Sequence, residues 1–468
     1  MFFNPELRRN IWLDFNYHRI IMAPIIIGLI VYIVYLTGSQ SSAATIAFEL
    51  ACFFIFLWGT KRSSETVIDE INNSTWDFQR QSSISPWAMT WGKLIGSTLY
   101  SWYGTAICLL LYSLLRTNTS HDFSGQILTS SLSISQELSL LLLGGLFSQA
   151  IALLLSIQVL SQIRREKTNK TFRYFLAAFI IGAFTTNFCF NALKGYDQQI
   201  SWHGYAFALG PFALTSLILF LGWAIIGLQR SFCKELQYQN IPWIWAGFNI
   251  FCMIYFSGLT SFQDFQFENL HFPELETIQQ QLANAPLYTA LFSAQLLTYF
   301  SLFTDDLSLI RYKHFFSRIK EHNTIESLQQ LPWWTISFTL TVIAGLIAMI
   351  KQQGVIFEKF SPTIFILTSI FFLLRDIELI HYFNFSKNPK KALSTAVLYL
   401  FLLYMLLPLL FSALHLNSLL PLFLPSWGQN TLLAFIGIVV QLGLLSALCY
   451  KRWQENLEKA KTVIKTSL

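Results

Sequence analysis

The alternation of long apolar runs with short charged clusters is the feature that most constrains what this chain can fold into. The apolar runs are about 17 to 25 residues long, which is the length an α-helix needs to cross about 30 Å of hydrocarbon. Only 12% of the residues are charged and 54% are hydrophobic, whereas about 25% of a soluble domain is charged. We therefore expect an all-α polytopic membrane protein.

About twelve runs have the length and composition of transmembrane helices. We place them at residues 20–37, 43–58, 94–115, 138–163, 172–190, 205–228, 241–261, 287–303, 334–350, 362–380, 392–414 and 432–450. Lys and Arg test this count, because positive residues collect on the cytoplasmic side of a membrane. With the N-terminus inside, the cytoplasmic segments hold 26 of the 31 Lys and Arg residues, the outer segments hold four, and one lies within a span.

This charge pattern predicts a multi-pass protein with both termini in the cytoplasm, in the inner (cytoplasmic) membrane of a bacterium. The formal net charge of +6 then reflects topology and contact with anionic headgroups. Membrane lipid is accordingly an expected partner, and nucleic acid is not. The six cysteines lie in or beside apolar runs and the eight histidines are dispersed, a pattern that favours buried small side chains over disulfides or a metal site.

Twelve spans divide into two parallel six-helix halves, since six crossings return the chain to the side on which it started. The expected domains are an N-terminal segment 1–19, a first half 20–228, a second half 229–450 and a basic cytoplasmic tail 451–468.

Long cytoplasmic loops, 59–93 and 304–333, follow the second span of each half. Both loops end in the same dipeptide, Pro86-Trp87 and Pro332-Trp333. The second half also has a long outer loop, 262–286, with four acidic residues and no Lys or Arg. We interpret this outer loop either as a docking site for an extracytoplasmic partner or as a lid packed on the bundle.

The N-terminal segment has the pattern of a short amphipathic helix in the cytoplasmic interface. Asn4 suits the N-cap, Pro5 the first helical position and Glu6 the positive end of the helix dipole. Apolar residues then recur every four positions, at Leu7, Ile11 and Phe15. Such a helix would anchor the first span or also hold a cytoplasmic partner.

The loop 59–93 contains a second amphipathic pattern. Its acidic face holds Glu65, Asp69 and Glu70, and its apolar face holds Val67, Ile68 and Ile71. Trp76, Phe78 and Arg80 follow before the turn at Pro86. An apolar face in water needs a cover, and this chain has no soluble domain to supply one. We therefore expect a separate protein to bind there.

The run Ile84-Ser85-Pro86-Trp87, then Gly92-Lys93-Leu94, resembles the permeases of ABC-2 type transporters. So does the opening Asn-Pro-x-Leu-Arg-Arg before the first span. The resemblance implies a coupling helix that inserts into a groove on a separate ATPase subunit, two such subunits per transporter, and ATP and Mg bound by those subunits. The chain would then be a membrane subunit of an exporter, with no enzymatic site, cofactor or metal of its own.

On this resemblance the ATPase-coupling residues are expected at Glu65, Ile68, Asp69, Glu70, Ile71, Trp76, Arg80, Pro86, Trp87, Gly92, Lys93, Pro332 and Trp333. The second loop keeps Pro-Trp but has no Gly-Lys after it, and its body is more basic. No phosphate-binding GxxxxGK[ST] motif occurs in the chain. The energy for transport would therefore come from another polypeptide.

Charged residues near the inner end of the tenth span form a separate candidate: Arg375, Asp376, Glu378 and His381. Spacings of three place Arg375 beside Glu378, and Glu378 beside His381, on one helix face. Buried charge in a membrane is costly unless it is paired. The cluster is therefore either a conformational latch or proton carrier, or a helix end with solvated charges.

Two other functions remain open at this stage. One is an ion-coupled secondary carrier of twelve helices, although its usual long loop between the halves is short here, at residues 229–240. The other is a membrane enzyme acting on lipid-linked substrates, which would need convergent polar residues at one membrane face. The substrate and the direction of transport have no signature in the sequence.

Overall fold

The computed structural model is almost entirely helical. It describes residues 4–82, 84–116, 120–121, 127–128, 133–158, 171–238, 242–259, 285–305, 307, 309–322, 324–351, 362–385, 392–425 and 431–466. Two small two-stranded sheets, which the sequence patterns did not indicate, pair β1 (Ser120–His121) with β2 (Ile127–Leu128) and β3 (Gln199–Trp202) with β4 (Tyr205–Ala208).

Among the described residues, eight helices are long and apolar enough to cross a membrane, compared with the about twelve spans expected from the sequence. They are Tyr17–Thr37, Gln40–Asn72, Ile134–Gln158, Leu176–Lys194, Leu209–Glu235, Trp333–Lys351, Ala392–Ala413 and Leu433–Glu455. The fold class is thus confirmed as an all-α polytopic membrane protein. The other four predicted spans fall on five further helices that are not among these eight: the pair α6 (Pro86–Gly96) and α7 (Leu99–Leu115), bent by 45°, and α12 (Trp243–Gly258), α14 (Ala285–Thr304) and α18 (Pro362–Asn384).

The chain divides into two compact units, the first made of residues 1–200 with 206–240 and the second of residues 201–205 with 241–468. The remaining helices of the first unit are α1 (Pro5–Asp14), α2 (Tyr17–Thr37), α3 (Gln40–Cys52), η1 (Phe53–Trp58), α4 (Gly59–Asn72), α5 (Trp76–Gln81), α8 (Ile134–Gln158), α10 (Thr171–Lys194) and α11 (Leu209–Glu235).

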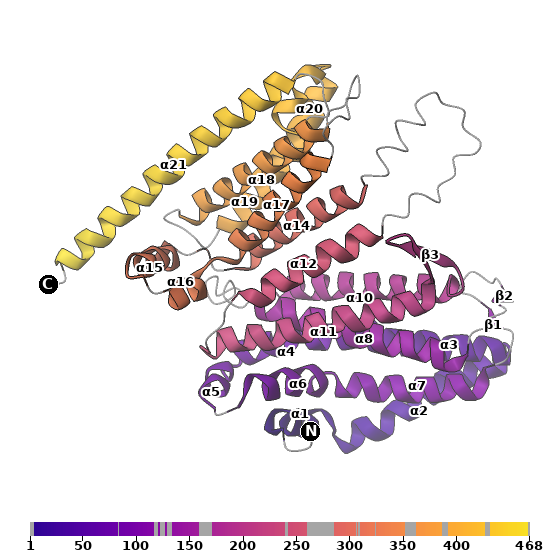
Figure 1. Ribbon diagram of the computed structural model, residues 1–468. Coiled ribbons are helices and arrows are strands. Elements are labelled where there is room, and N and C mark those ends of the chain that lie inside the picture. The colour runs from indigo at the N-terminus through magenta and orange to yellow at the C-terminus, as the bar shows by residue number, and fades with distance from the viewer. Residues whose placement is uncertain are drawn as a thin grey trace, which may run out of the picture. The chain divides into compact units, whose positions relative to one another are not determined.

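Helix α8 is central in the first unit, where it contacts α4, α10 and α11 (Figure 1). Its Leu153 belongs to a buried apolar cluster with Val67 from α4, Trp76 from α5 and Leu228 and Phe232 from α11. Helix α1 lies against α6 at one end of the unit. The first unit thus has its own core, which reaches as far as the loop that was expected to be open.

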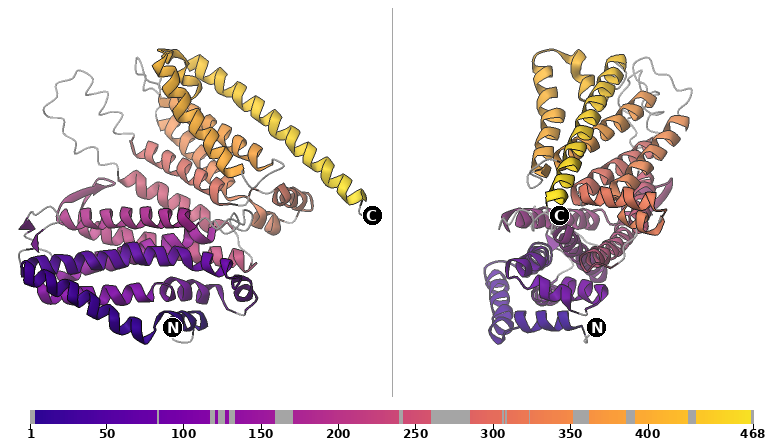
Figure 2. Two further views of the ribbon diagram at one scale, coloured as in Figure 1. Left: turned by 180° about the vertical axis from the view of Figure 1, so that it is seen from behind. Right: turned by 90° about the vertical axis from the view of Figure 1, so that its left-hand side faces the viewer.

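In the second unit, α14 packs between α12 and α17 (Trp333–Lys351), and α18 packs against α21 (Thr431–Thr466). Figure 2 shows α21, in yellow, as one uninterrupted helix, so the predicted tail 451–468 continues this helix through Thr466. The other elements are α15 (Leu309–Lys320), α16 (Thr324–Gln330), α19 (Ala392–Phe401), η4 (Leu402–Leu406), α20 (Leu407–Ala413) and η5 (Asn417–Leu422).

A π-helical segment interrupts one long helix in each unit, at η1 and at η4. In η1 the wider turn leaves backbone carbonyls open for other partners. Gln149 donates from Nε2 to the carbonyl of Ile55 at 3.0 Å, and Ser101 donates to the carbonyl of Phe54. Side chains from α8 and α7 therefore hold the break in place.

Candidate functional site

Helix α1 docks on α6 through residues of the two sequence motifs. Asn4 is the predicted N-cap, since its side chain accepts from the backbone N–H of Glu6 at 3.0 Å, and its Nδ2 donates to the carbonyl of Ala88 at 2.5 Å. Asn10 donates from Nδ2 to the carbonyl of Gly92 at 3.3 Å. A Cβ on Gly92 would lie 2.7 Å from the Cβ of Glu6, so only glycine permits this close approach.

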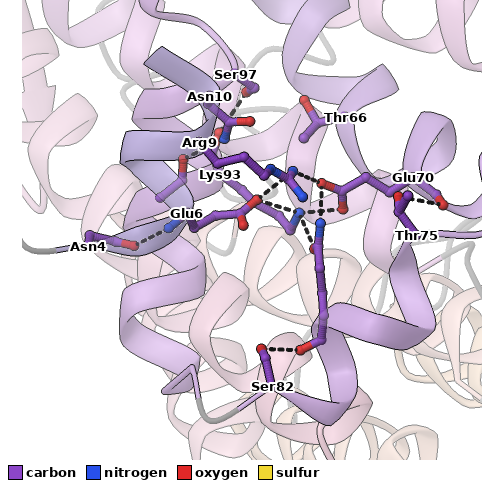
Figure 3. Close-up of polar contacts among 12 residues, drawn as sticks. Asn4, Glu6, Arg9, Asn10, Thr66, Glu70, Thr75, Ser82, Lys93 and Ser97 are labelled. Atoms are coloured by element: carbon purple, nitrogen blue, oxygen red, sulfur yellow. Dashed lines mark hydrogen bonds and ion pairs between the residues drawn. The ribbon is translucent and has the colours of Figure 1, made fainter. Parts of the chain in front are cut away.

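The ammonium group of Lys93 is the centre of a buried polar cluster (Figure 3). Its side chain is 0% exposed. It donates to Glu6 Oε1 at 3.1 Å and to Gln79 Oε1 at 2.9 Å, it contacts the carboxylate of Glu70, and it lies 5.3 Å from the ring centre of Trp76. An ammonium can be buried at this depth only because carboxylates and a ring face replace its water.

Arg9 and Gln79 complete this group, which we call the Lys93 cluster (Glu6, Arg9, Glu70, Gln79, Lys93). Arg9 donates from Nη2 to Glu6 Oε1 at 2.9 Å and also to Glu70, and Gln79 donates from Nε2 to Glu70 Oε1 at 2.8 Å. Two cations and two carboxylates balance in charge. Because the members come from α1, α4, α5 and α6, the cluster fixes these four helices to one another.

Glu70 belongs to the polar end of the helix Gln40–Asn72, twelve residues or about 18 Å beyond Trp58, where the apolar run ends, so we place it outside the hydrocarbon region. Its carboxylate is mostly buried, and burial by itself would raise its pKa. The charge of Lys93, with hydrogen bonds from Lys93, Gln79 and Arg9, outweighs burial and lowers the pKa of Glu70 below its ordinary value. Glu70 is therefore ionised at neutral pH and serves as an anion within the cluster.

The expectation that the apolar side of this loop is uncovered is wrong. Val67 and Ile68 are 0% and 3% exposed, and Trp76 is 2% exposed with its ring centre 6.4 Å from that of Phe232. Helices α8 and α11 supply the cover from within the same unit. The loop therefore gains its apolar partners from segments about 80 to 160 residues further along the chain, which periodicity in the loop alone does not reveal.

A smaller surface of the loop stays exposed. Asp77 and Phe78 on α5 have exposed side chains, with Phe78 at 76%, and Trp87 at the start of α6 is 48% exposed. The opposite side of α5 is fixed: Gln79 belongs to the Lys93 cluster, and Arg80 donates from Nε to the carbonyl of Glu235 at 3.1 Å, at the end of α11. We call Asp77 and Phe78 the α5 tip.

The predicted coupling residues therefore separate into two groups. Ile68, Glu70, Trp76, Gly92 and Lys93 are buried, whereas Glu65, Asp69, Ile71, Arg80, Pro86 and Trp87 are partly or fully exposed. Glu6, Arg9 and Gln79 belong to the site as well but were not predicted. The motif Asn-Pro-x-Leu-Arg-Arg was a signal for the first two, since it contains both of them.

The second predicted coupling segment is built around an ion pair. Arg311 donates from Nη1 to Asp305 Oδ1 at 2.6 Å, and from Nε and Nη2 to the carbonyls of Gln330 and Leu331. Asp305 Oδ2 accepts from the backbone N–H of Trp333 at 3.0 Å, which satisfies an open donor at the start of α17. Pro332 is buried, and the ring of Trp333 stacks on Trp245 with centres 5.7 Å apart.

Helix α15 gives this second segment a different outer surface. Phe316 and Ile319 are 51% and 46% exposed, and Lys320 is exposed beside them. The exposed charge on α15 is thus basic, while the charge on the α5 tip is acidic. The Pro-Trp dipeptides lead into similar helix starts, but the surfaces next to them do not match.

Arg375 and Asp376 are 1% and 0% exposed in the second unit, so they are not solvated at a helix end. Arg375 donates from Nε and Nη2 to Asp376 Oδ1 at 2.9 and 2.8 Å. Asp376 Oδ2 accepts from the hydroxyls of Tyr299 and Tyr404, each at 2.6 Å, and Arg375 Nη1 donates to Gln441 Oε1 at 3.0 Å. Arg375 and Asp376 are thus largely satisfied by partners from α14, η4 and α21.

Glu378 and His381 do not join this group, so the pairings expected from helical spacing are not the ones formed. Glu378 accepts from Ser446 at 2.6 Å. His381 Nδ1 lies 2.6 Å from the carbonyl of Ile377, which leaves Nε2 to accept from the hydroxyl of Tyr312 at 2.6 Å. Trp334 donates from Nε1 to the same hydroxyl at 2.8 Å, so His381 links α18 to α15 and α17.

The outer loop 262–286 lies outside the described residues except for the first two residues of α14. In the part of the chain that the structure describes, no group of His, Cys, Asp or Glu has the arrangement of a metal site.

No protein-family model, curated protein or solved structure matches this chain.

Proposed function

We propose that this chain is the transmembrane permease subunit of an ATP-driven ABC-type exporter. It would have about twelve spans and both termini in the cytoplasm, and it would lie in a bacterial inner membrane. Separate ATPase subunits, which bind ATP and Mg, would dock on it and drive an unidentified substrate across the membrane. The observation that carries the proposal is the α5 tip, an exposed acidic and aromatic surface on a helix whose other side is fixed.

The chemistry of the α5 tip suits a protein contact. A large aromatic side chain such as Phe78, exposed on a fixed backbone, loses little conformational entropy on binding and buries much apolar area. Asp77 beside it lies 3.6 Å from Arg80 of the same helix, but its side chain is 78% exposed, so its charge can still attract a basic partner surface. This surface is narrower than the apolar face expected from the sequence, and it replaces that face as the basis for docking.

The Lys93 cluster supplies a route for mechanical coupling. It joins α5 to α6, which leads into the membrane helix α7, and to α4, which continues through η1 into α3. A force on the α5 tip would therefore reach two membrane helices through buried, charge-assisted contacts. A second ATPase subunit would meet the second unit at α15 and α16, where its contact would be with basic charge.

The structure gives less support to the alternative function of an ion-coupled secondary carrier. An ion-coupled carrier needs an intramembrane group that changes protonation, but Asp376 already accepts from Arg375, Tyr299 and Tyr404. Protonating Asp376 would break part of that network and leave Arg375 without its anion. A structural role for Arg375 and Asp376 therefore agrees better with the contacts.

The test is co-purification with the ATPase subunits encoded beside the gene. We expect Phe78→Ala with Asp77→Asn to lower ATPase retention at least tenfold while the thermal midpoint of the chain stays nearly unchanged, because both side chains are exposed and the surface pair of Asp77 with Arg80 contributes little. Phe184→Ala is the matched control, since Phe184 is 73% exposed and lies in a membrane helix. If the double variant retained the ATPase as well as the control does, docking at the α5 tip would be excluded.

A further inference from the structure

Helix α1 bears a hollow on its surface, apart from the residues that dock on α6. The hollow has a volume of about 630 Å³ and is lined by Pro5, Arg8, Arg9, Ile11, Trp12 and Phe15. Glu6 and Asn10, which contact α6, do not line it. The hollow therefore lies beside the Lys93 cluster without being part of its buried interior.

The lining divides into a cationic part and an apolar part. Arg8 is exposed and forms no ion pair with any described residue, and Arg9 keeps 36% of its side chain exposed although its Nη2 binds Glu6 and Glu70. Ile11, Trp12 and Phe15 form the rest, and the ring of Phe15 is held by Tyr103 with centres 5.9 Å apart. Guanidinium groups next to apolar side chains can bind an amphipathic ligand that has both an anionic group and a hydrocarbon part.

The hollow also lies at a membrane boundary. Helix α2, one of the membrane helices, begins at Tyr17, three residues after α1 ends at Asp14. Trp12 and Tyr17 are 81% and 83% exposed, as aromatic side chains are where a protein enters the headgroup region. The first lipid-facing turn of α2 follows at once, with Ile21 57% exposed.

We propose that this hollow binds the headgroup region of an anionic phospholipid. Arg8 and the exposed part of Arg9 bind the phosphate, while the glycerol and the first acyl carbons lie on Ile11, Trp12 and Phe15. A free phosphate ion would leave that apolar wall uncovered, whereas a phospholipid covers both parts. Of the two carboxylates on α1, Glu6 is bound to Lys93 and Asp14 to Arg62, so neither repels the ligand strongly.

Arg9 connects the hollow to the Lys93 cluster, because the same guanidinium lines the one and binds Glu70 in the other. A bound phospholipid would therefore help to hold Arg9 in place and favour the docked position of α1. The lipid site and the α5 tip would then be linked through one side chain. The inference itself does not depend on the proposed transport function, only on the membrane location of α2.

The test compares lipid binding by the purified chain without any ATPase. Retention of phosphatidylglycerol and of phosphatidylcholine is measured by titration into detergent solution followed by native mass spectrometry. We expect Arg8→Gln to weaken phosphatidylglycerol binding about fivefold and phosphatidylcholine binding by a smaller factor, because both lipids carry the phosphate that Arg8 binds but only phosphatidylglycerol has a net negative charge. Trp12→Ala should weaken the binding of both lipids.

Lys320→Gln removes one exposed cation from α15 and is the matched control, which should leave phosphatidylglycerol binding unchanged. An equal loss in Lys320→Gln and Arg8→Gln would overturn the site and indicate diffuse surface charge. Unchanged phosphatidylglycerol binding in a folded Arg8→Gln protein would also overturn it. Unchanged thermal midpoints confirm that the variants are folded.

Discussion

The two units each present a segment after their second predicted span, and the two segments are built in opposite ways. In the first unit a cation, Lys93, is fully buried among two carboxylates, and the exposed α5 tip is acidic. In the second unit a carboxylate, Asp305, is fully buried beside Arg311, and the exposed charge on α15 is basic. A shared Pro-Trp dipeptide thus marks a shared helix start, while the buried ion and the exposed charge are set by other residues.

The number of helices that meet at each ion also differs. The Lys93 cluster joins side chains from four helices, whereas the contacts of Arg311 with described residues include the carboxylate of Asp305 and the backbone carbonyls of Gln330 and Leu331, all within 20 residues of it in sequence. The first segment is therefore suited to transmitting movement between helices. The second is suited to closing its own loop.

Lys93→Met should cause the largest loss of stability among the three substitutions that test this comparison. Methionine fills a similar volume but leaves Arg9 as the only cation that binds Glu6 and Glu70 among the described residues. This should lower the free energy of unfolding by about 3–5 kcal/mol and strongly lower the thermal midpoint of the purified protein. Lys320→Met, on the exposed side of α15, should change stability by less than about 0.5 kcal/mol. Equal midpoints for the two variants would show that the buried cation is not what holds the first segment together.

Arg311→Met should lower the free energy of unfolding by a smaller amount, about 2–3 kcal/mol, although it also removes the cation from a buried carboxylate. Asp305 keeps the backbone N–H of Trp333 as a donor, and the Arg311 side chain is 14% exposed where that of Lys93 is 0% exposed. Thermal denaturation of both variants in one detergent compares them directly. A loss larger than that of Lys93→Met would reverse the order that the two networks imply.

Gly92→Ala should have the smallest effect of the three, a loss of about 1–3 kcal/mol from overpacking. The new Cβ would meet the Cβ and Cγ of Glu6 at 2.7 and 2.8 Å, so α1 must move away from α6. Gly28→Ala in α2 is the control: nothing lies within 4 Å of its added Cβ, and the helix should gain up to about 1 kcal/mol. The same thermal assay separates close contact at Gly92 from a general effect of replacing helical glycine.

Local signals in the sequence predicted the helix starts and the apolar helices well. Asn4 and Pro5 open α1 as their capping preferences predicted, whereas Pro86, expected in a turn ahead of a span that begins at residue 94, opens α6 after the Ser85 cap. The end of the second span was placed at Trp58, whereas the helix runs on to Asn72, because η1 and α4 continue it without a break. Polarity marks where a helix leaves the membrane and not where it stops.

Long-range partners were not predictable from one sequence. Helical spacing paired Arg375 with Glu378, but Arg375 binds Asp376 next to it and Gln441 from α21, while Asp376 also accepts from Tyr299 and Tyr404 of other helices. Likewise, Lys93 was counted as a cytoplasmic charge and is in fact buried. Its carboxylate partners are 87 and 23 residues away, and only the packing of α1, α4 and α6 brings them together.

The separation of 87 residues between Glu6 and Lys93 has a consequence for biosynthesis. At about 5–20 residues per second, several seconds pass between the synthesis of α1 and that of its partner α6. During that time Glu6 can pair with Arg9, three positions away on the same helix. The early chain thus has only a local ion pair in α1, and the contacts that dock α1 on α6 can form only after Lys93 has been synthesised.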